Sequence, residues 1–244
     1  MSVHPFATLR GFAFAGAALT LTPLGCANNP AAGGPGTYRG VLVGATEIGT
    51  MEVTVAEASS GPLPASGTMD LAGTAVSLSG ALDRSQASLS LSSTAGHQLA
   101  GVSRTEYALG TYQGPQESGS FALLLEADSG SPVRLFCGSL VLTSSTGTGP
   151  IPFGVAATPS GSAFCVAPGF VWFGELDASG ALSCENRGGV FFGDVNAEDG
   201  NQWGTGSNYG TWTVAPCGGG APDGGADGGP NSSPDAGAGE DVPA

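Results

Sequence analysis

The chain has 244 residues with a formal net charge of -14, and only 11% of its residues are charged. It contains no lysine, so its few cations are arginines. Such a surface repels phosphate, which excludes nucleic acids and anionic lipid headgroups as expected partners. The 43 glycines, together with many Ser and Thr, predict short strands and turns.

Residues 1–25 have the organisation of a secretory signal peptide. Arg10 precedes the mostly apolar run "GFAFAGAALTLT", and the small-residue end "PLGC" follows. The apolar run is too short to cross a hydrocarbon core of about 30 Å as a helix. The sequence therefore predicts export of the chain.

The end of this segment, Gly25-Cys26, resembles the lipobox of bacterial lipoproteins, although Pro23 stands where that family prefers Leu. The resemblance implies cleavage before Cys26 and acylation of its thiol. The membrane would then be a partner through the N-terminal lipid. In that family Asp after the cysteine is the common inner-membrane retention signal, so with Ala27 at this position the resemblance implies the outer membrane or cell surface. The alternative is an ordinary signal peptide that leaves Cys26 free or removes it.

After a lipidated N-terminus and flexible linker (26–36), two similar blocks are expected at 37–130 and 131–217. Each block allows about eight short strands, typical of an all-β antiparallel meander, barrel or sandwich. Several pairs match between the blocks: Gly80, Leu82 and Asp83 with Gly174, Leu176 and Asp177; Gly101 with Gly193; Gly110-Thr111 with Gly204-Thr205; Gly119 with Gly210; and Leu78, Leu109 and Phe121 with Trp172, Trp203 and Trp212.

Block one alternates cleanly between apolar and polar residues. Met51, Val53 and Val55 share one side of a strand, and Leu89 and Leu91 alternate with serines. This pattern predicts a sheet with one buried and one hydrated face.

Block two instead has runs that are apolar on both sides, at 170–173 and 190–192. We expect these runs to be covered on both sides, by block one or by loops. The alternative is a binding face for a sugar or an apolar ligand, with Trp172, Trp203 and Trp212 as its aromatic residues.

The segment "GTYQGPQESGSF" (110–121) is similar to a hairpin of lipoprotein β-barrel domains of the transferrin-binding-protein type. This local resemblance implies a β-barrel that presents loops to a partner, without catalysis.

Four cysteines, Cys137, Cys165, Cys184 and Cys217, all fall in block two, and their spacing fits no zinc site. In an exported chain they predict two disulfides of open pairing. Closure of a barrel would favour Cys137 with Cys217. In a flat meander Cys165 and Cys184 would lie two strands apart, about 9.6 Å, too far to bond except at strand ends or across a bend.

Groups that could carry catalysis are few. His97 lies in an expected turn, without a nucleophile motif near it, and is interpreted as solvated. Four acids (Glu175, Asp177, Glu185 and Asp194) lie on neighbouring hairpins and keep open a carboxylate pair acting on polysaccharide. Asp194, Asn196 and Glu198 partly echo a Ca²⁺ loop but lack its glycine and final glutamate.

Residues 218–244 hold no aromatic residue and are expected to be a disordered Gly/Asp/Pro/Ala tail. The sequence thus favours a lipid-anchored envelope protein that binds a protein or carbohydrate, without cofactor and without catalysis. The alternatives are an extracytoplasmic hydrolase and a Ca²⁺-stabilised adhesin.

Overall fold

The computed structural model describes residues 31–127, 132–143, 149–186, 189–205 and 208–218. The expected signal peptide, the lipidation site Cys26 and nearly all of the expected tail lie outside these ranges. Among the described residues no helix is long and apolar enough to cross a membrane.

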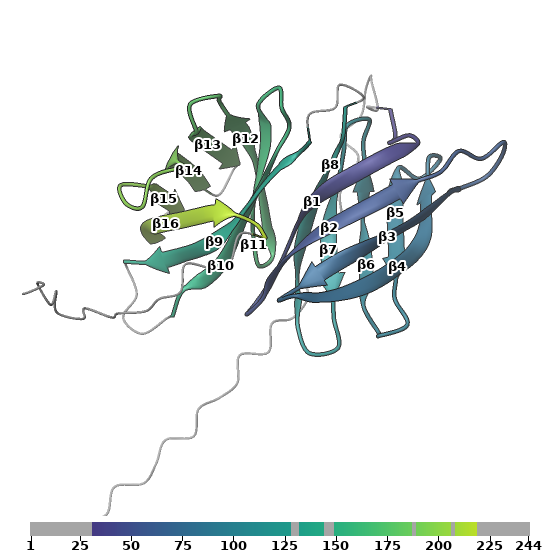
Figure 1. Cartoon of the computed structure of the whole chain (residues 1–244), viewed down its shortest axis with the longest axis horizontal. Coiled ribbons are helices and arrows are strands. Elements are labelled where there is room, and N and C mark those ends of the chain that lie inside the picture. Colours follow the sequence, from purple (N-terminus) through teal and green to yellow (C-terminus); the bar gives the residue numbers. More distant parts are fainter. Residues whose placement is uncertain (1–30, 128–131, 144–148, 187–188, 206–207, 219–244) are drawn as a thin grey trace, which may run out of the picture. The chain divides into compact units, whose positions relative to one another are not determined.

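The described chain forms two closed barrels of eight antiparallel strands each, so the all-β expectation is confirmed (Figure 1). Barrel one consists of β1 (Gly36–Gly44), β2 (Ile48–Val55), β3 (Leu63–Leu71), β4 (Thr74–Asp83), β5 (Ser88–Ser92), β6 (Gln98–Ser103), β7 (Tyr107–Gln113) and β8 (Ser118–Leu125). Barrel two consists of β9 (Arg134–Leu142), β10 (Ile151–Ala157), β11 (Ser162–Ala167), β12 (Phe170–Leu176), β13 (Ala181–Asn186), β14 (Gly189–Asp194), β15 (Gln202–Thr205) and β16 (Asn208–Pro216).

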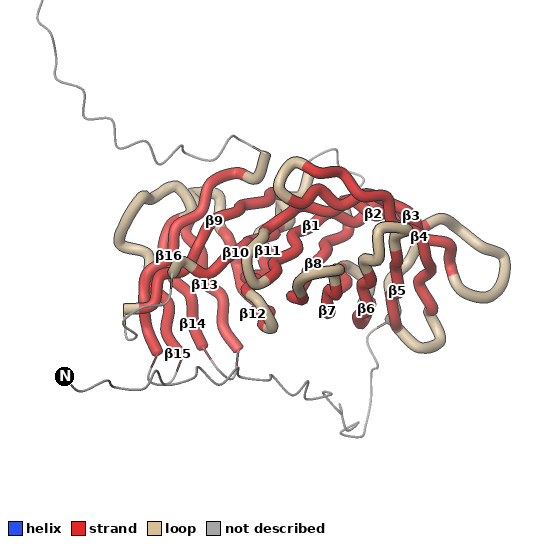
Figure 2. Tube along the Cα trace, turned by 90° about the horizontal axis from the view of Figure 1, so that it is seen from below, coloured by secondary structure: helices blue, strands red, loops and turns tan. Residues whose placement is uncertain are grey.

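Each barrel is an up-and-down meander whose first and last strands pair. In barrel one β1 pairs with β8 from Tyr38 opposite Leu125 to Gly44 opposite Gly119. In barrel two β16 pairs with β9 in the same way. Closure leaves no open sheet edge among the described strands of either barrel, and Figure 2 shows the neighbouring strands of each barrel side by side. Of the expected architectures, the barrel is the one the chain adopts.

Alternation of side chains decides what fills each barrel. Met51, Val53, Val55, Leu89 and Leu91 are all buried in barrel one, as their spacing predicts. Full burial of one such side chain stabilises a fold by about 1.5–3 kcal/mol. The Ser and Thr residues between them face outward.

A glycine in the fourth strand of each barrel lets the strands approach closely. A Cβ at Gly80 would lie 2.9 Å from the Cα of Leu91 on β5, and one at Gly174 would lie 2.6 Å from the Cα of Cys184 on β13. Real Cβ atoms do not come so near a neighbouring backbone, so the close approach of these strands depends on glycine.

The turns after these strands are also equivalent. Asp83 Oδ1 accepts hydrogen bonds from the Ser85 N–H and hydroxyl, and Asp177 Oδ1 accepts the same two from Ser179. The hydroxyl in particular lowers the pKa of each aspartate below its ordinary value.

Not every matched pair is equivalent. Gly110 lies on the inner face of β7, with buried Ala108 and Tyr112. On β15 the buried residue is Trp203, so the next residue, Gly204, lies on the outer face. Leu109, matched to Trp203, lies in an apolar cluster outside its barrel. The match of residues 109–110 with residues 203–204 is therefore wrong by one residue, because a shift of one residue moves a side chain to the opposite face of its strand.

That outer cluster joins the two barrels, which belong to one compact unit beginning at Ala31. It contains Val41, Val43, Ala122 and Leu124 from barrel one and Ala156, Phe164 and Val166 from barrel two, all buried. The two barrels therefore bury apolar surface against one another.

Candidate binding site

The three tryptophans lie inside barrel two. Trp172, Trp203 and Trp212 are 5%, 8% and 1% exposed, and Phe191 packs against Trp172 and Trp203. The Trp212 indole N–H donates to the Gln202 carbonyl at 2.9 Å. The three tryptophans thus belong to the core of barrel two, and the alternative of an open binding face at these residues is not the one the structure shows.

The outer sides of the two apolar runs are both partly exposed. Phe173 on β12 contacts Tyr107 of barrel one and Phe164 on β11. Val190 and Phe192 on β14 remain 38% and 47% exposed. Phe170 and Phe173 on β12 are 60% and 47% exposed as well, so the expectation that both runs are covered on both sides is wrong for both strands.

The cysteines form two disulfides, Cys137–Cys217 and Cys165–Cys184. Cys137 on β9 bonds the residue that follows β16, with Cα atoms 5.0 Å apart, as barrel closure favours.

Cys165 on β11 and Cys184 on β13 bond across β12, with Cα atoms 6.2 Å apart. The flat-sheet distance of about 9.6 Å does not apply, because a closed barrel bends and its chord is shorter. Gly174 lies beneath the bond, where a Cβ would come within 2.8 Å of Cys184 Sγ.

The carboxylates of barrel two are spread over turns and outer faces. Asp177 Oδ1 is occupied by the turn bonds described above, and Asp194 Oδ1 accepts the Asn196 N–H at 2.8 Å. The Asn196 side chain donates to the Ser179 carbonyl. Asn201 Oδ1 accepts the Asp194 N–H, and the Asn201 side-chain amide donates to the Asp194 carbonyl. Within the described ranges, no three His, Cys, Asp or Glu side chains are grouped so that they could hold a metal ion.

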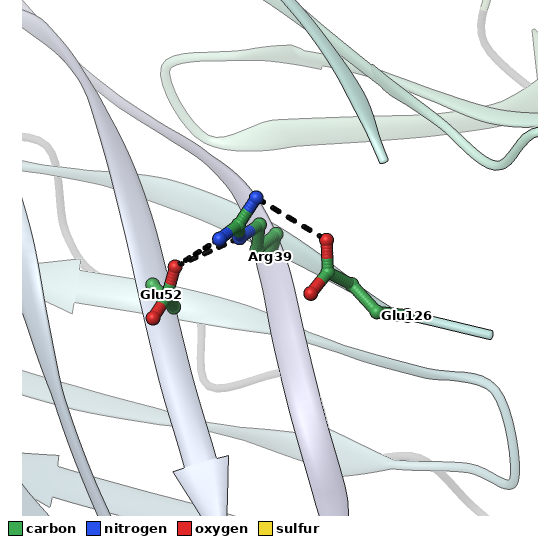
Figure 3. A network of polar contacts seen from close by, with 3 residues as sticks. All are labelled: Arg39, Glu52 and Glu126. Carbon is green, nitrogen blue, oxygen red and sulfur yellow. Dashed lines mark hydrogen bonds and ion pairs between the residues drawn. The ribbon is translucent and has the colours of Figure 1, made fainter. Parts of the chain in front are cut away.

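Arg39 forms an ion-pair network on the outside of barrel one (Figure 3). Its guanidinium lies 2.6 Å from Glu52 Oε2 and 3.3 Å from Glu126 Oε1. Such partly exposed pairs contribute about 0–1 kcal/mol, so this network neutralises charge more than it stabilises the fold.

The residues that converge best lie at one end of barrel one, which we call the mouth. Three turns meet there: 45–47 between β1 and β2, the β5–β6 turn ending at His97, and 114–117 between β7 and β8. They surround a hollow of about 580 Å³. Ligand sites commonly measure about 300–1,000 Å³, so the mouth is large enough for a small molecule.

Tyr112 and His97 form the inner wall of the mouth. Tyr112 is 2% exposed, and its hydroxyl contacts His97 Nδ1 at 3.0 Å. The two rings stack with centroids 5.8 Å apart. A Cβ at Gly114 would lie 2.9 Å from Tyr112 Cζ, so the absence of a side chain at Gly114 lets this pair form.

Glu117 places a carboxylate at the rim of the same hollow. Its Oε2 accepts the N–H and the hydroxyl of Thr46, at 3.1 and 3.0 Å. Its Oε1 is buried and has no hydrogen-bond partner among the described residues. Gly44 leaves the space for this carboxylate, because a Cβ there would lie 2.7 Å from Oε2.

The electrostatics of the mouth are negative. Burial raises the pKa of Tyr112 above its ordinary value, and the charges of Glu117 and Glu47 raise it further. The tyrosine therefore stays neutral at physiological pH and can donate a hydrogen bond.

Sequence reasoning missed this site. His97 was expected to be solvated, yet it is half-buried against Tyr112. The segment 110–121 does form a hairpin, β7–β8, and its loop lines the mouth. The order of the chain separates Glu47, His97 and Glu117 widely, and only closure of the barrel brings their turns together.

Comparison with protein-family models, curated proteins and solved structures finds no match to this chain. The functional argument therefore depends on the residues and geometry described above.

Proposed function

We propose that the chain is an exported, lipid-anchored protein of the cell envelope that binds a small ligand at the mouth of barrel one. The hollow lined by His97, Tyr112 and Glu117 carries the proposal, because it combines suitable volume with polar groups from three turns. The barrel interiors are packed with side chains, so the ligand would be held by the turns at the barrel end.

The location rests on separate observations. The two disulfides are compatible with an extracytoplasmic compartment. The N-terminal segment and its similarity to a lipobox support export and acylation of Cys26. Replacing Cys26 with Ser should move the expressed protein from the membrane fraction to the soluble fraction. Retention of the variant in the membrane would contradict the anchor.

Binding is favoured over hydrolysis because two of the four carboxylates first considered for catalysis are engaged in turns, and the other two, Glu175 and Glu185, lie on the exposed outer face of barrel two. Asp177 and Asp194 act as hydrogen-bond acceptors in turns, and Glu175 points outward from β12. The envelope-binding role is thus the better explanation of the observed geometry.

The test of this proposal is to block the hollow with a large side chain and measure ligand binding. Gln116→Trp places a large side chain in the hollow, while Gln86→Trp makes the same change in the β4–β5 turn, at the opposite end of barrel one. Soluble envelope metabolites and cell-wall fragments are screened against both variants and the parent by saturation-transfer NMR.

Compounds that bind the parent and Gln86→Trp but not Gln116→Trp would support the site. Equal binding by all three proteins, or no binding by the parent, would overturn it. Far-ultraviolet circular dichroism would confirm that both variants keep the barrel.

A further inference from the structure

The exposed apolar side chains of the protein gather on one barrel. Within the described ranges, the large apolar side chains that stay exposed all belong to barrel two. Barrel one packs mainly on β10 and β11, and the strand order places β14 and β15 on the opposite side of barrel two. Exposed apolar residues that cluster on that side are therefore left open by barrel one, and such clusters mark interaction sites.

Strand register groups four of these side chains on β14, β15, β16 and β9. Gly204 on β15 pairs with Val190 on one side and with Tyr209 on the other, so no side chain stands between them in that row. The adjacent row of outward residues continues the surface as far as β9. We call this surface the neutral face, and its six outward side chains are Val141, Val190, Phe192, Gln202, Tyr209 and Thr211.

The neutral face combines aromatic rings with free hydrogen-bonding groups. Phe192 and Tyr209 are 47% and 58% exposed, so much of each ring is open to solvent. Gln202 and Thr211 are exposed beside them, and neither side chain has a hydrogen-bond partner among the described residues. The amide of Gln202 and the hydroxyls of Thr211 and Tyr209 can therefore donate and accept hydrogen bonds with a ligand.

The charge of this surface differs from that of the whole chain. None of its six side chains is charged, although the chain carries a formal charge of -14. Exposed Glu175 and Glu185 lie on β12 and β13, beyond the edge of the face. An anionic partner would be repelled by the chain, and a cationic partner would find no counter-charge on the face itself. Charge complementarity thus favours an uncharged partner.

The size of the neutral face disfavours a second copy of the chain as its occupant. Four strands about 4.8 Å apart, with two outward residues that each cover about 7 Å of strand, span roughly 270 Å². A stable protein interface buries about 800 Å² on each partner. A contact that spread further over β13 and β12 would reach Glu185 and Glu175, so two copies would bring like charges together.

We propose that the neutral face of barrel two binds an uncharged, extended polysaccharide chain. A sugar ring presents C–H groups on its faces and hydroxyls around its edge. The C–H groups pack on Phe192 and Tyr209, and the hydroxyls exchange hydrogen bonds with Gln202 and Thr211. This site is separate from the mouth of barrel one, so either site can fail its test without the other.

The test is native electrophoresis through gels that contain a soluble polysaccharide, because binding slows the protein. Hydroxyethyl cellulose, xylan and galactomannan provide uncharged extended chains. Carboxymethyl cellulose has the backbone of hydroxyethyl cellulose with added negative charge. The parent is compared with Phe192→Ser, Tyr209→Ser and the matched control Phe170→Ser, which truncates an exposed ring on β12 outside the neutral face. The mouth variant Gln116→Trp is the second control.

We expect at least one uncharged chain to slow the parent and carboxymethyl cellulose to leave it unaffected. Phe192→Ser and Tyr209→Ser should each weaken binding about two- to tenfold, which corresponds to the loss of one aromatic contact. Phe170→Ser and Gln116→Trp should bind like the parent. Unfolding followed by the fluorescence of the core tryptophans would show that barrel two keeps its fold in each variant.

Failure of every uncharged chain to slow the parent would overturn the assignment, as would unchanged affinity in both Phe192→Ser and Tyr209→Ser. Loss of binding in Gln116→Trp alone would place the polysaccharide at the mouth of barrel one instead. Sedimentation of the parent as a dimer and of Phe192→Ser as a monomer, without polysaccharide binding, would assign the neutral face to a second copy of the chain and would also overturn the proposal.

Discussion

The disulfide Cys137–Cys217 should stabilise barrel two more than Cys165–Cys184 does, because it joins the two ends of the barrel and closes the longer segment of chain. The test is the double variant Cys137→Ser/Cys217→Ser. It removes the bond from the outer side of the β9–β16 seam and leaves the strand pairing and the side chains inside barrel two unchanged, while Cys217 also packs against the outer cluster.

The expected loss follows from the length of chain that the bond closes. The cysteines are 80 residues apart. Loss of loop-closure entropy in the unfolded chain then corresponds to about 4.5 kcal/mol at 25 °C. The bond between Cys165 and Cys184 closes only 19 residues, for which the same relation gives about 3.2 kcal/mol. A loss of the larger size is a substantial part of the roughly 5–15 kcal/mol that stabilises a typical domain.

The tryptophans make the measurement specific to barrel two. Trp172, Trp203 and Trp212 all lie in its core, and barrel one contains no tryptophan. Guanidinium unfolding followed by tryptophan fluorescence therefore reports barrel two, while circular dichroism reports both barrels. The parent treated with reductant serves as a control in which both bonds are open.

A loss below about 1 kcal/mol, with an unchanged dependence on denaturant, would refute the reasoning. It would mean that the unfolded chain is already compact, or that the bond does not restrain the ends. Peptide mapping of the parent under non-reducing conditions would decide between these explanations, since the structure requires a linked pair containing Cys137 and Cys217.

Two further predictions concern the equivalent strands and turns. Gly174→Ala should lower the free energy of unfolding by about 1–3 kcal/mol, because the new Cβ meets the β13 backbone and Cys184 Sγ. Gly149→Ala, just before β10 of the same barrel, where a Cβ meets nothing, should be near neutral in the same fluorescence assay. Asp177→Asn should make the loss of stability below about pH 4 less steep. The lowered pKa of Asp177 stabilises the fold above the ordinary aspartate pKa, and this contribution is lost as the pH falls through the lowered pKa. An Asn variant with the parent's acid slope, in unfolding curves measured from pH 5 to pH 2, would contradict this second prediction.

Much of the fold follows from local patterns. Alternation at Met51, Val53 and Val55 identifies the inner face of β2, since successive side chains of a strand point to opposite sides. The matched Asp83 and Asp177 mark equivalent turns, because a short carboxylate can accept backbone N–H groups two and three residues ahead. Export and acylation at Cys26 remain predictions.

Local sequence patterns did not predict the candidate site. His97 in isolation reads as an exposed turn residue, and nothing in the sequence places Glu117 beside Thr46, which lies 71 residues earlier. Apolar residues on both faces of β12 and β14 were expected to be covered, but covering depends on where barrel one packs against barrel two. Tyr107 of barrel one contacts Phe173 and leaves it 47% exposed.

The sequence by itself determined the all-β class, the inner and outer faces of most strands and the positions of the turns, because each depends on residues that are near in the chain. It also determined that the second block holds four cysteines, an even number that can form two disulfides. Tertiary structure alone decided closure into barrels, the disulfide across β12 and the meeting of three turns around Glu117. These features depend on strand curvature and register, which sum small contributions over a whole barrel and leave no mark at any single residue.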